Sequence, residues 1–188
     1  MKGIYTILIF LFFFFFSFSQ SKKEIDIKKS NIEWVGKKVT GKHEGTIKVK
    51  SGYIELSNNK IIGGEFIVNM TSIICTDLSG GSKKSLEGHL KDEDFFDVEN
   101  HPTSSLQIKS SDKNKIYGTI TIKGISQPIE FDYKMESRGG QVIVFSDIKI
   151  DRTKFNIHYK SKTIFPTQFL DNFIYDEFII KTNPIILK

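Results

Sequence analysis

The residues that most often carry catalysis are few in this chain and widely separated. The four histidines, His43, His89, His101 and His158, fall in different segments, and none has a second histidine at the spacing of a zinc protease. There is no Gly-x-Ser-x-Gly nucleophile elbow, and Gly80–Lys84 lacks the spacing of a phosphate-binding loop. The sequence therefore predicts no catalytic residues and no metal site. A hydrolase that pairs a histidine with a nearby serine is a minor alternative.

Two further reactive groups have structural interpretations. Cys75 is the only cysteine, so the chain has no internal disulfide and its stability must come from packing. It follows the apolar pair Ile73-Ile74, which predicts a buried thiol that behaves as a small hydrophobic group. The charged pair Asp151-Arg152 stands between apolar neighbours and predicts a hydrogen-bond network at the end of a strand.

The N-terminus has the pattern of a signal peptide over residues 1–19. Met1 and Lys2 give a basic start, and Ile4–Phe16 is an uncharged, apolar run of 13 residues, shorter than the roughly 20 that a membrane-spanning helix needs. Small residues then alternate before Gln20, which predicts cleavage near Ser19-Gln20. We expect a periplasmic or secreted protein; an uncleaved anchor is the alternative.

The predicted mature chain has 169 residues, enough for one domain with a substantial core. We expect a lead-in segment over residues 20–29 and a single domain over residues 30–188. With 26 basic and 22 acidic residues, the mature net charge is +4. The lysine pairs at 22–23 and 28–29 are interpreted as aids to solubility, with weak attraction to an anionic membrane surface or to phosphorylated lipids as the alternative. Export and the even mixing of charges exclude nucleic acid as a partner.

Most of the mature chain alternates apolar and polar residues at a period of two. The runs are Tyr117–Lys123, Ile129–Glu136, Ile47–Lys50, Phe66–Met70, Leu106–Lys109 and Ile148–Asp151. Alternation with one charged face is typical of an antiparallel sheet that has one side in water. Turns containing Gly, Asn or Pro separate the runs, so the pattern predicts an all-β sandwich or barrel.

One segment, between residues 79 and 101, departs from the alternation. Leu86 and Leu90 have helical spacing, and Asp92 is suited to cap a further turn that carries Phe95 and Phe96. We therefore expect one or two short helices in the connection around residues 82–97. The two phenylalanines predict an aromatic plug, which either closes one end of the core or contacts a ligand.

If the sheet closes into a barrel of about eight strands, its apolar face must point inward. Such a barrel is either filled by side chains or holds one small ligand, and alternation alone does not decide between the two. No candidate for the interior is charged, which favours a hydrocarbon chain as the ligand. These candidates are Trp34, Phe66, Val68, Met70, Phe131 and Tyr133.

Four stretches together resemble a known family. They are Asn31–Val39 with Gly41–Thr46, His89–Lys91 with Asp94–Val98 and His101-Pro102, Gly118–Ile125 with Pro128-Ile129, and Asp151–Phe155. In this order and spacing they resemble the YceI-like, or polyisoprenoid-binding, lipocalin-like proteins over about Ser30–Lys188. The resemblance implies an extended eight-stranded antiparallel barrel with a helical segment, an apolar pore for an isoprenoid or other lipid-like chain, and export to the periplasm. It assigns residues that close the fold first and touch a ligand second: His89, Phe95, Phe96, Asp151 and Arg152.

The sequence thus predicts an exported lipid-binding protein that is not an enzyme. The barrel lumen, with Phe95 and Phe96 added to the interior candidates, is expected to hold an isoprenoid, quinone or fatty-acid derivative, and no other cofactor is expected. Expected partners are the long-chain lipid, an anionic membrane surface at its periphery, and a second copy of the chain in a homodimer. The alternative is a packed barrel that serves as a periplasmic interaction or stress-response module without an internal ligand.

Overall fold

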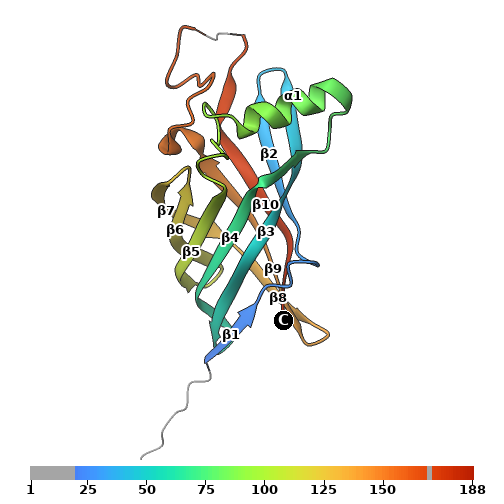
Figure 1. Ribbon diagram of the computed structural model, residues 1–188. Helices are drawn as coiled ribbons and strands as arrows, with labels where there is room; N and C mark the ends of the chain where they lie inside the picture. The colour runs from blue at the N-terminus through green and yellow to red at the C-terminus, as the bar shows by residue number, and fades with distance from the viewer. Residues whose placement is uncertain (1–19, 169–170) are drawn as a thin grey trace, which may run out of the picture.

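The alternating sequence folds into a single curled antiparallel sheet (Figure 1). The computed structural model describes residues 20–168 and 171–188, so the predicted signal peptide lies outside the described residues. The elements are β1 (Gln20–Glu24), β2 (Ile32–Lys38), β3 (Gly41–Ser57), β4 (Lys60–Cys75), α1 (Gly80–Lys91), β5 (Thr103–Asp112), β6 (Lys115–Ile122), β7 (Ile125–Asp132), β8 (Lys134–Arg138), β9 (Gln141–Asp151), the 3-10 helix η1 (Arg152–Phe155) and β10 (Ile174–Leu187). The prediction of an all-β fold is confirmed.

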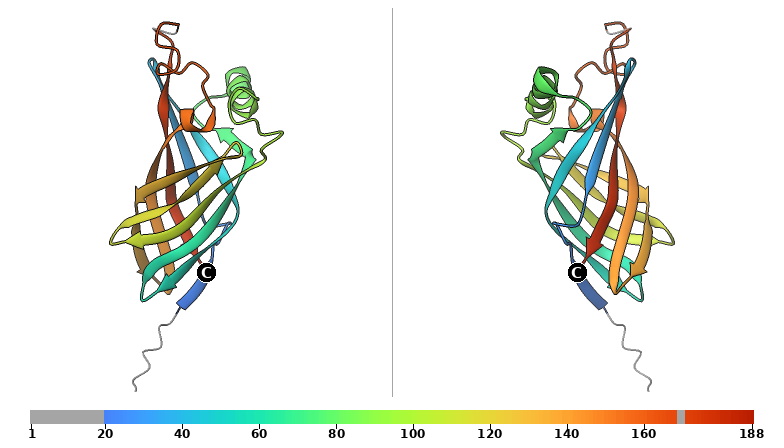
Figure 2. Two further views of the ribbon diagram at one scale, coloured as in Figure 1. Left: turned by 90° about the vertical axis from the view of Figure 1, so that its left-hand side faces the viewer. Right: turned by 90° about the vertical axis from the view of Figure 1, so that its right-hand side faces the viewer.

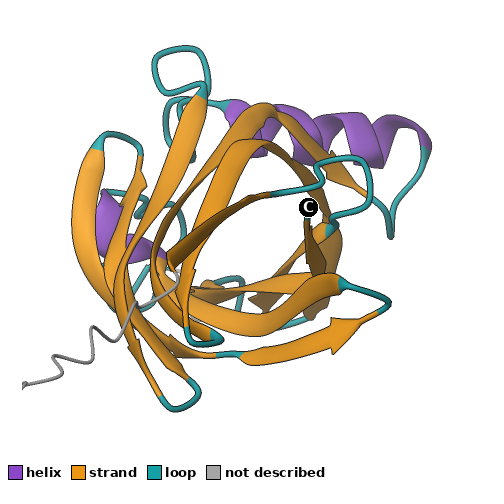
Figure 3. Cartoon of the chain, turned by 90° about the horizontal axis from the view of Figure 1, so that it is seen from below, coloured by secondary structure: helices purple, strands orange, loops and turns teal. Residues whose placement is uncertain are grey.

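The sheet closes on itself through one bent strand. Its order is β7-β6-β5-β4-β3-β2-β10-β9-β8, and only Tyr133 separates β7 from β8. β7 pairs with β6, β8 pairs with β9, and β7 also contacts β9. Counting β7 and β8 as one strand gives the expected eight-stranded barrel, whose strands form a ring in Figure 3. The run expected from Ile129 to Glu136 is therefore bent at Tyr133, where it changes its partner strand.

The expected lead-in segment is part of the sheet. β1 pairs antiparallel with the end of β3, from Gln20 opposite Ser57 to Glu24 opposite Tyr53. The next residue, Ile25, forms an isolated bridge with Leu187 in the last strand. Residues 20–25 thereby connect β3 and β10, the two neighbours of β2, at one end of the barrel.

The two ends of the barrel differ in the elements they carry. Figures 1 and 2 place α1, η1 and the turn between β2 and β3 at one end, which we call the helix end. β1, the C-terminus and the turn between β8 and β9 lie at the other, which we call the C-terminal end. The C-terminal end is closed by aliphatic side chains that are 0–4% exposed. They are Ile25, Ile54, Ile61 and Leu187.

The connection between β4 and β5 contains one α-helix. α1 ends at Lys91, and Asp92 has an extended backbone with ψ of 164°. The carbonyl of Asp92 then accepts hydrogen bonds from the N–H groups of Phe95 (3.1 Å) and Asp97 (2.8 Å), which form turns. The sequence left open whether residues 92–97 form a second helix, and the structure shows that they form turns. No helix among residues 20–168 and 171–188 has the length and apolar composition needed to cross a bilayer.

Candidate functional site

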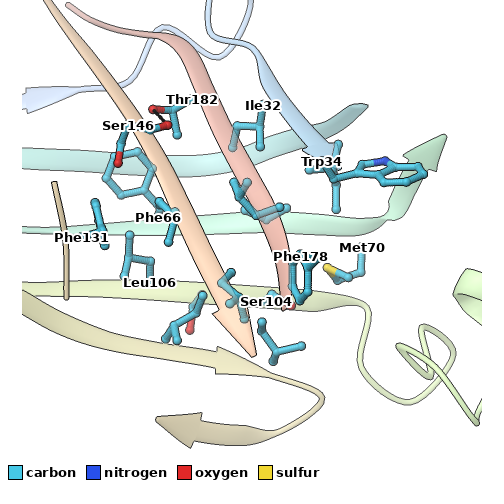
Figure 4. Close-up of a pocket in the computed structure, with 18 of the residues that line it drawn as sticks. Ile32, Trp34, Phe66, Met70, Ser104, Leu106, Phe131, Ser146, Phe178 and Thr182 are labelled. Atoms are coloured by element: carbon cyan, nitrogen blue, oxygen red, sulfur yellow. Dashed lines mark hydrogen bonds between the residues drawn. The ribbon is translucent and has the colours of Figure 1, made fainter. Parts of the chain in front are cut away.

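A cavity lies inside the barrel, above the closed C-terminal end. The space open to the centres of water-sized molecules is about 170 Å³, whereas one water requires roughly 10–15 Å³ on this measure. The lining side chains are mainly aliphatic and aromatic, and Figure 4 shows several of them around the cavity. Inward-facing residues such as Val68, Leu106 and Ile180 stay only partly buried, because one side of each faces this space.

Seven of the eight predicted lumen residues line the cavity. They come from β2, β4, β7 and the turns after α1, and they are Trp34, Phe66, Val68, Met70, Phe95, Phe96 and Phe131. Period-two alternation brings Phe66, Val68 and Met70 to the same face of β4. The sequence pattern therefore identified the inner face of this strand.

Tyr133, the eighth predicted residue, lies outside the lining. It occupies the bend between β7 and β8 and is 6% exposed. Its phenol hydroxyl donates to the carbonyl of Lys113 at 3.3 Å and to Ser111 Oγ at 3.4 Å. Ser111 in turn donates to the carbonyl of Ile61 at 2.5 Å. Because Ile61 belongs to the closed end, Tyr133 packs there and does not face the cavity.

Trp34 is fixed in the wall by a hydrogen bond and by a glycine. Its indole N–H donates to the carbonyl of Ile74 at 3.1 Å. A Cβ atom on the facing Gly45 would lie 1.9 Å from that carbonyl oxygen and 2.6 Å from the indole ring. Glycine at position 45 therefore leaves the space that the indole ring and the Ile74 carbonyl of β4 occupy.

The aromatic residues after α1 form a cluster at the helix end. The rings of Phe95 and Phe96 meet edge to face at 5.0 Å, and Phe96 meets Phe178 of β10 at 6.1 Å. Phe95 also contacts His89 of α1 at 5.4 Å. Both phenylalanines are under 9% exposed and both line the cavity, so the expected aromatic plug both completes the core and borders the cavity.

Arg152 forms the predicted network at the end of β9. It is 1% exposed, and it donates to the carbonyls of Tyr175 (3.2 Å), Ile157 (2.9 Å) and Ile174 (3.0 Å). Asp176 lies 3.4 Å away. Burial lowers the pKa of Arg152, and the neighbouring carboxylates oppose that shift. Arg152 also lines the cavity, so it places one buried charge beside the apolar space.

Few hydroxyl groups border the cavity. Ser146 donates to the carbonyl of Asp132 at 2.7 Å, and Thr182 donates to the carbonyl of Ser146 at 3.3 Å. Ser104 Oγ is buried without a hydrogen-bond partner. A buried hydroxyl without a partner costs free energy, so Ser104 marks a place where a bound oxygen or nitrogen atom is favoured.

Sequence reasoning missed the lining contributed by the last two strands. These residues are Val144, Ser146, Ile148 and Ile150 of β9, and Ile174, Tyr175, Phe178, Ile180, Thr182 and Ile185 of β10. The signal was present in β9, where Val144 to Ile150 alternate at period two. Ser104 was equally within reach, because it continues the alternation of Leu106 and Ile108.

At the helix end, the cavity lining includes a solvent-exposed residue where the pairing of β2 with β10 is irregular. Ile174 pairs with Lys38 and Phe178 pairs with Gly36, with a register irregularity between them. Tyr175 lies within this irregularity; it lines the cavity and is 49% exposed. A Cβ atom on Gly36, which also lines the cavity, would meet nothing within 4 Å. The opening is therefore bordered by Tyr175 and Gly36.

The remaining titratable groups lie outside this lining. His43 Nδ1 is 2.9 Å from Asp77 Oδ2, and Asp77 Oδ1 accepts from the thiol of Cys75 at 3.1 Å and from the N–H of Glu44 at 3.0 Å. Burial alone would raise the pKa of Asp77, but these three hydrogen bonds outweigh it and hold the pKa below its ordinary value. Burial raises the pKa of Cys75, which agrees with the predicted inert, buried thiol.

The other histidines also stand apart from the cavity. His101 lies 3.7 Å from Asp97, and His158 is 3.2 Å from the carbonyl of Thr153. Ligand-capable atoms of His89, Asp92 and Asp94 lie within 4.8 Å of one another, with both carboxylates exposed. None of these residues lines the cavity, and the described part of the chain contributes no histidine or carboxylate to its lining.

An antiparallel barrel with an apolar cavity that opens at one end defines a lipocalin-like protein. The chain belongs to the YceI-like family, because the model of the YceI-like domain matches residues 24–183. This match confirms the resemblance found in the four sequence stretches.

Solved structures with the same fold come from several bacteria. BcnA of Burkholderia cenocepacia matches with a TM-score of 0.70 at 20% identity, over 87% of this chain and 99% of that chain. A polyisoprenoid binding domain from Saccharophagus degradans, implicated in plant cell wall breakdown, matches with a TM-score of 0.65 at 12% identity, over 88% and 97%. The Campylobacter jejuni YceI protein matches with a TM-score of 0.51 at 18% identity, over 69% and 74%. At these identities the likeness establishes the fold alone.

A comparison with curated protein sequences gives no match.

Proposed function

We propose that this protein is an exported, non-enzymatic carrier that holds one apolar chain in its barrel cavity. The observation that carries the proposal is the apolar cavity itself, closed at the C-terminal end and open beside Tyr175. A solidly packed barrel would leave no such space, so the cavity disfavours the alternative of an interaction module without a ligand. The polyisoprenoid binding of the Saccharophagus relative supports an isoprenoid, quinone or fatty-acid derivative as the occupant.

Burial of hydrocarbon would supply most of the affinity. Each methylene that leaves water contributes about 0.8 kcal/mol, so ten methylenes supply roughly 8 kcal/mol before ordering costs. An exposed charge pair contributes at most about 1 kcal/mol. Chain length and width would therefore decide which lipids bind.

One buried hydroxyl group in the cavity lining narrows the class of ligand. Ser104 Oγ has no hydrogen-bond partner among residues 20–168 and 171–188, and a ligand oxygen within hydrogen-bond reach would satisfy it. A quinone, an alcohol or an acyl derivative offers such an oxygen, whereas a plain hydrocarbon does not. The proposal therefore favours an oxygen-bearing lipid.

Export follows from the predicted signal peptide. It is tested by the intact mass and N-terminal sequence of the protein from expressing cells. A mature chain that begins near Gln20 is expected, and a retained Met1 would contradict cleavage.

The carrier proposal is tested by mass spectrometry of an organic extract from natively purified protein. The expected result is a long-chain lipid at about one molecule per chain. A clean extract from folded protein that also takes up no such lipid at micromolar concentration would contradict the proposal.

A pair of glycine substitutions localises the site. Gly36→Leu adds a side chain at the cavity opening, where a Cβ meets no neighbour, and is expected to reduce the bound lipid strongly. Gly88→Leu adds the same side chain to the exposed face of α1, where a Cβ likewise meets nothing within 4 Å, and should leave lipid content unchanged. Equal lipid content in the two variants would place the ligand elsewhere.

A further inference from the structure

The opening of the cavity is surrounded by apolar side chains that face solvent. Val39, Ile164 and Tyr175 are 45%, 41% and 49% exposed, and they come from the turn after β2, the segment before β10 and β10 itself. Large exposed side chains scattered singly are ordinary, but a contiguous group at a functional opening indicates a contact surface. With the half-buried Phe173 and four lysines, Lys37, Lys38, Lys160 and Lys162, we call them the mouth patch.

Contacts connect the three chain segments that form the mouth patch. The N–H of Val39 donates to the carbonyl of Phe173 at 3.3 Å, and the rings of Phe173 and Tyr175 meet at 5.2 Å. Lys162 Nζ lies 4.9 Å from the centre of the Phe173 ring. The N–H of Ile174 donates to the carbonyl of Lys160 at 2.9 Å. Segments far apart in the sequence thus form one surface.

The lysines of the mouth patch are not neutralised by the protein. Among the described residues, none of the four has a carboxylate oxygen within 4.0 Å. The nearby Asp176 and Glu177 are paired with Arg152 and Lys149. Only Asp171 is a further exposed acid in the segment that precedes β10. The patch therefore combines free positive charge with exposed apolar groups.

We propose that the mouth patch docks on the surface of an anionic lipid bilayer, so that the cavity opening faces the membrane. Tyrosine and aliphatic side chains suit the boundary between headgroups and acyl chains, and lysines are attracted to anionic headgroups. The use of this contact for lipid exchange rests on the proposed carrier function. Tyr175 belongs to both the patch and the cavity lining, which makes the path from membrane to cavity continuous.

The positive charge of the mouth patch favours an anionic bilayer over a second copy of the chain as its partner. Two mouth patches in a symmetric dimer would bring like charges together, which is unfavourable. An anionic bilayer complements the same charges. The predicted homodimer, if it forms, is therefore expected to use another face.

Vesicle co-sedimentation of the full chain tests the docking surface. The variant Lys37→Glu/Lys162→Glu/Ile164→Ser reverses two charges and removes apolar area in the patch without changing a residue of the cavity lining. The matched control, Lys23→Glu/Lys28→Glu/Ile27→Ser, makes the same changes near the C-terminal end, where Ile27 is 47% exposed. All three proteins are prepared in the same way and their N-termini are verified by intact mass, so any contribution of residues 1–19 is equal.

With vesicles of equimolar phosphatidylglycerol and phosphatidylcholine, the mouth variant is expected to lose more than tenfold in partitioning. Each lysine near an anionic surface contributes about fivefold, and added salt should weaken wild-type binding. The control variant should bind as the wild type does, and pure phosphatidylcholine should bind all three proteins equally. Equal partitioning of both variants into the anionic vesicles would overturn the inference.

Lipid extracted from the same three proteins separates this inference from the carrier proposal. Loss of vesicle binding by the mouth variant alone, with equal lipid content in all three, supports both. The same selective loss without bound lipid in any of them supports the docking surface and contradicts the carrier function.

Discussion

The two ends of this barrel are built from the same strands, yet one is solid and the other encloses space. At the C-terminal end, β1 and Ile25 cover the strand ends, and small aliphatic side chains fill the interior. At the helix end, the register of β2 and β10 is irregular, and large aromatic rings stand around a space they do not fill.

The difference shows that alternation alone does not produce a cavity. Ile61 and Leu187 are almost fully buried and do not line the cavity, whereas Val68 and Ile180 line it and stay partly exposed. Both ends carry covering segments, so what decides is how the inward side chains meet: aliphatic side chains fill the closed end, and aromatic rings at the helix end leave a space between them. The following substitutions test this contrast.

Replacement of Arg152 is expected to have the largest effect, because it supports the open end. Arg152→Met leaves the carbonyls of Ile157, Ile174 and Tyr175 without their donor, and we expect a loss of about 3–5 kcal/mol in the free energy of unfolding. Urea unfolding followed by the fluorescence of Trp34, the only tryptophan, measures it. Arg152→Lys should recover part of the loss, since it keeps the charge but not the planar set of donors. A loss below about 1 kcal/mol for Arg152→Met would show that water replaces the guanidinium there.

A matched pair of isoleucines compares the two ends directly. Ile61→Ala, at the closed end, should cost about 2–5 kcal/mol, because it creates a void in a packed region. Ile148→Ala, in the cavity wall, should cost clearly less in lipid-free protein, since one side of Ile148 already lacks neighbours. Both are measured by urea unfolding at the same pH. Equal losses would mean that the cavity is filled in solution, which lipid analysis of the same samples would reveal.

Asp77 tests whether polar contacts hold the helix end together. Its folded-state pKa lies below the ordinary value of 3.8, so its contribution is present above that pH and is lost as the pH falls below it. Asp77→Asn should therefore lower the free energy of unfolding by about 1–2 kcal/mol at neutral pH. The difference from the wild type should shrink steadily below about pH 4. A difference that does not depend on pH would show that the carboxylate charge is not the cause.

The smallest effect is expected from Ser104→Ala. Removing an unpartnered hydroxyl should leave the free energy of unfolding unchanged within about 0.5 kcal/mol, or raise it slightly. Affinity for a lipid whose oxygen contacts Ser104 should fall several-fold, in proportion to one neutral hydrogen bond of about 1 kcal/mol. Titration of delipidated protein with the extracted lipid measures this change. Unchanged affinity would indicate that the oxygen of the ligand lies elsewhere.

The sequence could predict the strands and much of the inner face, because period-two alternation records which side of a strand meets water. Phe66, Val68 and Met70 were identified in this way. It could not predict the bend at Tyr133, since the pattern continues through it while the partner strand changes. Whether the inward side chains fill the barrel or leave a cavity depends on how segments far apart in the chain pack together, which alternation within one strand does not record.

Arg152 illustrates the same limit at a single residue. Its position at the end of an apolar strand indicated a hydrogen-bond network, and this is confirmed. Its place beside the cavity depends on β10 and on residues after η1, which the local sequence does not reveal. The opening at Gly36 and Tyr175 likewise arises from the register of two strands far apart in the chain.

The closed C-terminal end has a consequence for the order of events. A ligand leaves a cavity that has one opening by the route through which it entered, so the first part of a chain to enter is the last to leave. For the proposed carrier function, the donor and the acceptor of the lipid would have to bind in turn at the same face of the molecule, and a bound lipid would block entry of the next one. The rate of turnover would then be limited by dissociation of the bound lipid. In a tunnel with two openings, by contrast, a second ligand can enter at one end while the first leaves at the other.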